Sequence, residues 1–171
     1  MVCHQRQMGR DQNSSTLLMK LHYPKRGLNS YCGPAILSYL TGIPTHVAAR
    51  HIRRHSGQRA VRSCGIHFLR LALKDFGYHT SDELNVKGLT VNQWLKEYDK
   101  KRTPQRVYLV LAGRHFYLFK GQEYICGLVD KPTSIKDKSL KRRCRIYSVH
   151  EVIKHVLRYK SDNSPVFALE Q

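Results

Sequence analysis

The first half of the chain carries apolar residues at every third or fourth position, the period of an amphipathic helix. Gly42 and Gly77 come directly after two of these segments, where a left-handed C-cap would end a helix. Thr90 and Gln93 have the spacing of a capping box, which opens a helix. The pattern therefore predicts four helices, over 32–40, 45–54, 65–76 and from Thr90 to Tyr98.

The second half changes to short runs of β-branched and aromatic residues, which are typical of strands. Three such runs predict an antiparallel meander: VYLVL (107–111), HFYLF (115–119) and YICGLV (124–129). Ser148 and Glu151 again have capping-box spacing, so we expect a last helix that buries Val149, Val152, Ile153, Val156 and Leu157. A short final strand is expected around Pro165. Helices followed by antiparallel strands indicate an α+β fold.

The length of 171 residues is sufficient for one domain with a sizeable core. Residues 1–15 are polar and carry no apolar period, so we expect a flexible tail. The rest of the chain, 16–171, is expected to form a single domain. Its helical half would span about 28–100 and its sheet half about 105–171.

The charge balance is unusual, because 30 lysines and arginines stand against 12 acidic residues, a formal net charge of +18. Such a surface attracts polyanions, so nucleic acid or an acidic partner is expected, beside the alternative of a generally basic, soluble surface. Two stretches concentrate the cations: Arg50, Arg53 and Arg54 in the second helix, and Lys138, Lys141, Arg142, Arg143 and Arg145 in the loop 131–145. Each stretch alone is better explained as a solvated charged face, and it is the two together that favour a polyanionic partner.

The five cysteines form an odd, irregular set, which predicts reduced thiols rather than a disulfide framework. No pair of CxxC knuckles is present, so neither a metal nor a cofactor is predicted. No apolar run approaches the roughly 18 residues of a membrane span. The N-terminal segment also lacks the apolar core of a secretory signal. We therefore expect a protein of the host cytoplasm or a virion-associated protein, with no membrane partner.

Cys32 stands in the first turn of the first predicted helix, followed by Gly33 and Pro34. The positive end of a helix dipole stabilises a thiolate over a thiol. Glycine allows a substrate or backbone to approach closely, and proline is tolerated where its missing N–H would have had no partner. The combination suits an accessible, ionisable sulfur, although a packed structural cysteine would also suit this helix.

A nucleophilic thiol needs a base, and the base needs a group that orients it. If the turn between the second and third strands is centred on Gly121 and Gln122, His115 stands opposite Leu128. Asp130 is then one diagonal step from His115 on the same face, at about 7–8 Å between backbones. For the oxyanion, the backbone N–H of Cys32 is one donor and the side chain of Asn29 a candidate second donor. Asn29 is equally explained as a turn residue.

These segments together resemble a known superfamily. "NSYCGPAILSYLTG", "GRHFYLF" and "GLVDKP" are similar, in this order, to the papain-like cysteine peptidases, including bacteriocin-processing exporter peptidases. The chain looks closer still to small phage and bacterial proteins of uncharacterised activity. The resemblance runs from about Gly27 to Asp130. It implies a papain-like fold in which Cys32 is the nucleophile, His115 the base and Asp130 the orienting acid.

One position departs from the family pattern. Many members place a glutamine six residues before the cysteine to complete the oxyanion hole, and here that position is Arg26. The function that the resemblance implies is cysteine-dependent hydrolysis of a peptide or isopeptide bond in a protein substrate. Acyl transfer and transglutamination pass through the same thioester and stay open. The alternative is a catalytically weak or inactive member that binds nucleic acid or an assembly partner through its basic surface.

Overall fold

The computed structural model of this protein describes residues 22, 31–61, 64–86, 88–98, 105–129, 131–154, 158–159 and 165–166. Within these residues it contains four helices and a six-stranded antiparallel sheet, so the predicted α+β class is confirmed. The expected tail at 1–15 lies outside the described residues.

All four helices predicted in the first half are present. They are α1 (Cys32–Thr41), α2 (Thr45–Ser56), α3 (Ile66–Lys74) and α4 (Val91–Glu97). Gly42 ends α1 with a φ of 78°, and its N–H donates to the carbonyl of Ser38. At α4 the predicted capping box is complete, because the Thr90 hydroxyl accepts from the Gln93 N–H and the Gln93 side chain accepts from the Thr90 N–H.

The six-stranded sheet has the order β1-β6-β2-β3-β4-β5. Its strands are β1 (Tyr78–Thr80), β2 (Val107–Ala112), β3 (His115–Lys120), β4 (Glu123–Cys126), β5 (Thr133–Ser134) and β6 (Ile146–Lys154). A separate pair is formed by β7 (Arg158–Tyr159) and β8 (Pro165–Val166), where a final strand was expected. The three residues of β1 carry too short a pattern for the sequence to have predicted them.

The predicted register of the β3–β4 hairpin is confirmed over the length of β4. Tyr117 pairs with Cys126 and Lys120 with Glu123, so the turn is centred on Gly121 and Gln122. However, β4 ends at Cys126, and the expected pairing of His115 with Leu128 does not form. The side chain of Leu128 is 63% exposed. The end of β3 that carries His115 is therefore unpaired on its β4 side.

The predicted last helix is wrong, because Ile146–Lys154 forms β6. This strand pairs with β1 on one side and β2 on the other. Side chains on both of its faces are covered, including Ser148, Val149 and His150, so its apolar pattern does not alternate and resembles that of a helix. Pairing on both edges outweighs the local signal of the capping-box spacing.

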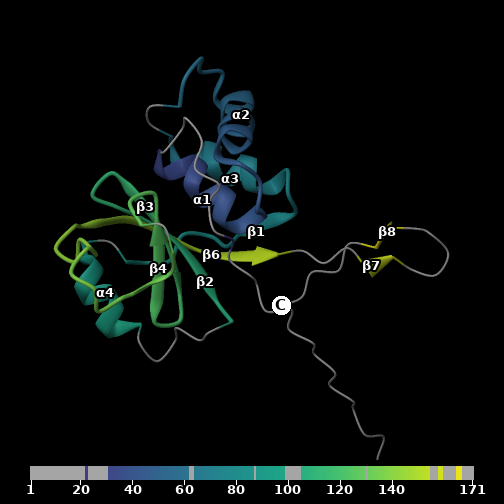
Figure 1. Cartoon of the computed structure of the whole chain (residues 1–171). Helices are drawn as coiled ribbons and strands as arrows, with labels where there is room; N and C mark the ends of the chain where they lie inside the picture. Colours follow the sequence, from purple (N-terminus) through teal and green to yellow (C-terminus); the bar gives the residue numbers. More distant parts are fainter. Residues whose placement is uncertain are drawn as a thin grey trace, which may run out of the picture.

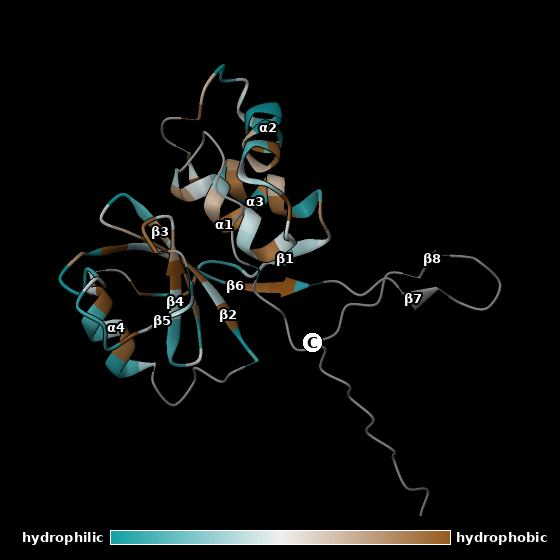
Figure 2. Ribbon diagram, viewed as in Figure 1, coloured by the Kyte–Doolittle hydropathy of each residue, from teal (hydrophilic) through white to brown (hydrophobic). Residues whose placement is uncertain are grey.

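The sheet separates two hydrophobic cores. Helices α1, α2 and α3 lie together on one side of it and α4 on the other (Figure 1). Ile36, Leu69 and Leu118 belong to the first core, whereas Trp94 and Phe119 belong to the second. Hydrophobic residues are concentrated in β4 and β6, and hydrophilic residues cover much of α2 (Figure 2). Residues that alternate along β2 and β3 thus face different layers of the protein.

Candidate active site

Cys32 is the first residue of α1, and its N-terminus has no side-chain cap. The residue at the N-cap position is Tyr31, which is 44% exposed. Gly33 packs directly on Cys64: a Cβ at this position would lie 3.2 Å from the Cβ of Cys64 and 3.5 Å from its sulfur. A larger residue would therefore push the start of α1 away from the segment before α3.

The sulfur of Cys32 is mostly buried, and this burial raises its pKa. The backbone N–H groups of Phe116, Gly33 and Cys32 itself oppose the shift and lower the pKa, but they do not reverse it. The expectation of a thiol with thiolate character is thus wrong for the resting site, because loss of hydration outweighs the positive helix end. Since Phe116 follows His115 in the chain, its N–H brings the sulfur to the backbone beside His115.

His115 opens β3 directly after a tight turn in which Gly113 and Arg114 both have positive φ, 55° and 63°. Its ring packs edge-on against Tyr117, with 5.0 Å between the ring centroids. The Nε2 atom is buried and has no hydrogen-bond partner among the described residues. Burial lowers the pKa of His115, and the charge of Lys141 lowers it further. The imidazole is therefore neutral near neutral pH, and it is able to accept a proton.

Three further residues share this environment, and the sequence assigned none of them to the chemistry of the thiol. Tyr117 is buried beneath His115, and the charges of Cys126 and Cys32 add to the burial that raises the pKa of its hydroxyl. Lys141 acts electrostatically on both His115 and Cys126. The hairpin register could have identified Cys126, since it stands opposite Tyr117. The sequence marked Lys141 only as one cation of the basic loop, because its effect on His115 depends on tertiary contacts.

The proposed partners Asp130 and Asn29 lie outside the described residues, as does Arg26. The residue before Asp130 is nevertheless attached to α1. The hydroxyl of Tyr39 donates to the carbonyl of Val129 at 2.5 Å, with the carbonyl of Cys126 3.2 Å away. Within the described part of the chain the Nε2 atom of His115 has no hydrogen-bond partner, so it does not bond to the Cys32 sulfur. What the structure brings together is the Cys32 sulfur and the backbone at the start of β3.

The basic loop 131–145 is fastened to the same corner. The Gly113 N–H donates to the carbonyl of Arg145 at 3.2 Å. The sulfur of Cys144 lies over Gly113, where a Cβ would come within 2.6 Å of it. Cys144 in turn is linked to α4, because its carbonyl accepts from the N–H of Val91. The loop therefore connects the turn before His115 with the start of α4.

The two basic stretches expected to bind a polyanion are on different sides of the sheet. Arg50 and Arg54 are exposed and Arg53 half-buried on α2, which packs in the first core. The loop residues Lys138, Lys141, Arg143 and Arg145 are exposed and Arg142 is half-buried, in a segment anchored to the second core through Ile135 and Leu140. The fold does not join the two stretches into one surface.

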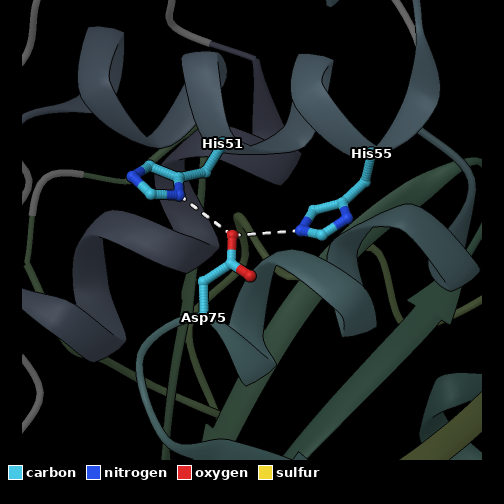
Figure 3. Close-up of polar contacts among 3 residues, drawn as sticks. All are labelled: His51, His55 and Asp75. Carbon is cyan, nitrogen blue, oxygen red and sulfur yellow. Dashed lines mark hydrogen bonds and ion pairs between the residues drawn. The ribbon is translucent and has the colours of Figure 1, made fainter.

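A second cluster of titratable groups lies between α2 and the end of α3 (Figure 3). The Nδ1 atom of His51 and the Nε2 atom of His55 each lie 3.0 Å from the same carboxylate oxygen of Asp75. Burial raises the pKa of Asp75, but the two histidines together lower it further than burial raises it. Both histidines are half-buried and join the two helices. Within the described residues no group of three or more histidine, cysteine or acidic side chains is arranged to hold a metal ion.

Comparisons with known proteins give one structural similarity. No family model matches the chain, and no curated protein matches it. Among solved structures, the chain is similar to the peptidase domain of Streptococcus ComA, a bifunctional ABC transporter involved in a quorum-sensing pathway. The two share 16% sequence identity over 79% of this chain and 96% of that domain, with a TM-score of 0.44. Among the described residues, no helix has the length and apolar character needed to cross a membrane.

Proposed function

We propose that this protein is a papain-like cysteine-dependent hydrolase acting on a peptide or isopeptide bond. The observation that carries the proposal is the contact of the Cys32 sulfur with the backbone N–H of Phe116, next to His115. Nucleophilic catalysis requires an imidazole next to the thiol, so in this proposal the His115 ring reaches the Cys32 sulfur in the reacting site. Asp130 is the proposed orienting acid, and its neighbour Val129 is fixed to α1 by Tyr39.

The pKa directions indicate how the reaction would begin. Burial keeps Cys32 as a thiol and His115 as a neutral imidazole, so the resting pair carries no charge. His115 takes the thiol proton as the sulfur attacks the carbonyl carbon of the substrate. The imidazolium then gives this proton to the leaving amine, and a thioester remains on Cys32. Water, deprotonated by His115, attacks the thioester and releases the acid and the free thiol.

The start of α1 offers donors for the oxyanion that forms in this step. The N–H groups of Cys32 and Gly33 belong to the first turn of the helix, where no intrahelical acceptor exists. Both face the sulfur in the resting site, so a carbonyl carbon bonded to that sulfur would bring its oxygen within their reach. Asn29 is the proposed additional donor. Removal of a single such donor lowers kcat by about 10²–10³-fold in other enzymes.

Selective alkylation tests this proposal. Near neutral pH, iodoacetamide should modify Cys32 at least about tenfold faster than Cys64, Cys126 or Cys144, because only Cys32 has an adjacent base. His115→Ala should remove this preference, while His46→Ala, at an exposed position on α2, should leave it unchanged. An electrophilic peptide probe should form its thioether on Cys32, which would report the substrate class. Equal modification of all accessible cysteines, with no effect of His115→Ala, would contradict the proposal.

A second candidate function is a catalytically weak or inactive member of the same superfamily. The raised pKa of Cys32 favours it, since a buried thiol with no thiolate character reacts slowly without an effective base. Its partner would be a polyanion bound through the basic loop. In that case the alkylation preference of Cys32 would be absent while binding to nucleic acid would persist and weaken steeply with salt.

A further inference from the structure

A cavity of about 570 Å³ lies beside α4, apart from Cys32 and His115. One wall is formed by Asn92, Leu95 and Lys96 of α4, and the opposite wall by Ile135, Lys136 and Arg142 of the basic loop. Gln122 of the β3–β4 turn also lines this cavity, which is open to solvent. The volume is within the range of about 300–1,000 Å³ that is common for small-molecule sites.

The lining has charge of one sign. Its three ionisable residues, Lys96, Lys136 and Arg142, are all cations, and among the described residues no carboxylate lines the cavity. The nearest acid in the loop sequence is Asp137, whose carboxylate accepts hydrogen bonds from the N–H and the hydroxyl of Ser139. The positive charges of the cavity are therefore not neutralised from within it, and an anion would be attracted there.

The position of Arg142 is fixed before any ligand binds. Its guanidinium donates to the carbonyl of Ile135, and its own carbonyl accepts from the N–H of Asn92 on α4. A guanidinium carries five N–H donors in a planar fork, so one bond to the loop leaves the geometry of the others defined. Such a fork matches the oxygens of a phosphate, whereas a flexible lysine contributes mainly point charge.

The cavity also has an apolar part, provided by Leu95 and Ile135, and side-chain amides at Asn92 and Gln122. Amides offer both donors and acceptors, which suit the edge of a nucleobase, and aliphatic side chains pack against its face. Free inorganic phosphate would use the cations alone. The combination is that of a site for an anion with a flat, partly apolar body.

We infer that this cavity binds the phosphate and base of a nucleotide, either a free nucleotide or one unit of a single-stranded nucleic acid. The inference does not depend on hydrolysis at Cys32, because the lining includes neither Cys32 nor His115. It differs from the expectation of a broad basic surface in that α2 takes no part. Lys96, which lies outside both basic stretches, becomes a binding residue.

Fluorescence anisotropy with a labelled short oligothymidylate tests the inference on the full chain. The cavity variant, Lys96→Glu/Lys136→Glu, reverses the charge of two exposed cations of the cavity. The control variant, Arg54→Glu/Lys74→Glu, makes the same change of charge at exposed positions of α2 and α3. At low salt the cavity variant should bind at least about tenfold more weakly than the wild type, and the control less than about threefold. In the cavity variant, the slope of log K against log salt concentration should also be smaller in magnitude by about one to two.

Competition identifies the source of the nucleotide. If ATP displaces the oligothymidylate from the wild type and not from the cavity variant, the site binds free nucleotides. If ATP does not compete and the cavity variant still loses binding, the site binds a single strand. Equal weakening in the two double variants would overturn the inference. Displacement by poly-glutamate as effective as that by ATP would also overturn it, because the site would then be specific for charge alone. Cys32→Ser should bind like the wild type, which separates this result from the proposed hydrolase activity.

Discussion

The N-termini of α1 and α4 solve the same physical problem in different ways. Each helix start exposes N–H groups that no intrahelical carbonyl accepts. In α4 the N–H groups of Val91, Asn92 and Gln93 donate to the carbonyls of Cys144 and Arg142 and to the hydroxyl of Thr90. Two of these donors join α4 to the basic loop and the third is satisfied by the cap, so this terminus is a structural joint.

At α1 the corresponding donors join no other element among the described residues. Pro34 has no N–H, and the N–H groups of Cys32 and Gly33 face the sulfur of Cys32. Tyr31, at the N-cap position, supplies no side-chain acceptor. A helix N-terminus without a cap therefore differs from a capped one in more than its lower stability. It retains donors that can stabilise negative charge on a sulfur or an oxyanion.

The largest expected effect separates the two termini by function. Cys32→Ser should lower the reaction with an electrophilic peptide probe by on the order of 10³-fold or more, because it removes the nucleophile. Thr90→Ala should leave this rate unchanged and should lower the free energy of unfolding by about 1 kcal/mol through loss of the cap. Intact mass spectrometry measures the adduct, and urea denaturation measures the stability. A similar loss of reaction in both variants would mean that the two termini do not differ in function.

The turn that precedes His115 gives the next effect. Gly113→Ala should destabilise the protein by about 3 kcal/mol, because a left-handed residue gains a Cβ and that Cβ collides with Cys144. Gly88 also has a positive φ, but no atom lies within 4 Å of where its Cβ would be. Gly88→Ala should therefore cost only about 1 kcal/mol. Thermal or urea unfolding compares the two; equal costs would show that Cys144 does not pack on the turn in solution.

A side-chain cap at the start of α1 should make this N-terminus resemble that of α4, with more stability and fewer free donors. In Tyr31→Ser the new hydroxyl can accept from the Gly33 N–H, which should stabilise the protein by about 0.5–1 kcal/mol. The same bond removes a donor from the sulfur of Cys32, so alkylation of Cys32 should slow severalfold. Tyr31→Phe is the control, since it supplies no acceptor. Faster alkylation in Tyr31→Ser than in Tyr31→Phe would contradict the role assigned to this N–H.

The smallest effect concerns the charge that the basic loop adds to the site. Alkylation of Cys32 should fall at acidic pH, because protonated His115 is no longer a base. Lys141 lowers the pKa of His115 and so moves this fall to lower pH. Lys141→Glu removes the positive charge and raises the pKa of His115, and the fall should move to higher pH by less than about one unit, as expected for an exposed group. Lys138→Glu, also exposed in the loop, should not move it. A shift to lower pH in Lys141→Glu would exclude this electrostatic effect.

The sequence was sufficient where local chemistry decides the structure. Gly42 and the Thr90–Gln93 capping box placed the end of α1 and the start of α4 within one residue. The two-residue turn at Gly121 and Gln122 determined the register of the β3–β4 hairpin. Such signals act over a few residues and need no tertiary context.

The failures arise where distant segments decide. Ser148 and Glu151 have the same spacing as Thr90 and Gln93, yet they lie in β6, because β1 and β2 pair with this segment on both sides. The expected thiolate character of Cys32 considered only the helix and omitted the burial of the sulfur, which raises its pKa. Lys141 lowers the pKa of His115 only because the loop that carries it is bonded to the turn at Gly113.

By itself the sequence determined the four helices of the first half, the hairpin register and the residues able to carry thiol chemistry, since propensity, capping and turn geometry are properties of neighbouring residues. Only the tertiary structure decided which of these residues meet, how far each is removed from water and on which side of the sheet each basic stretch lies. Burial and electrostatic interactions depend on distances in space, and a chain order does not contain them until the strands have paired.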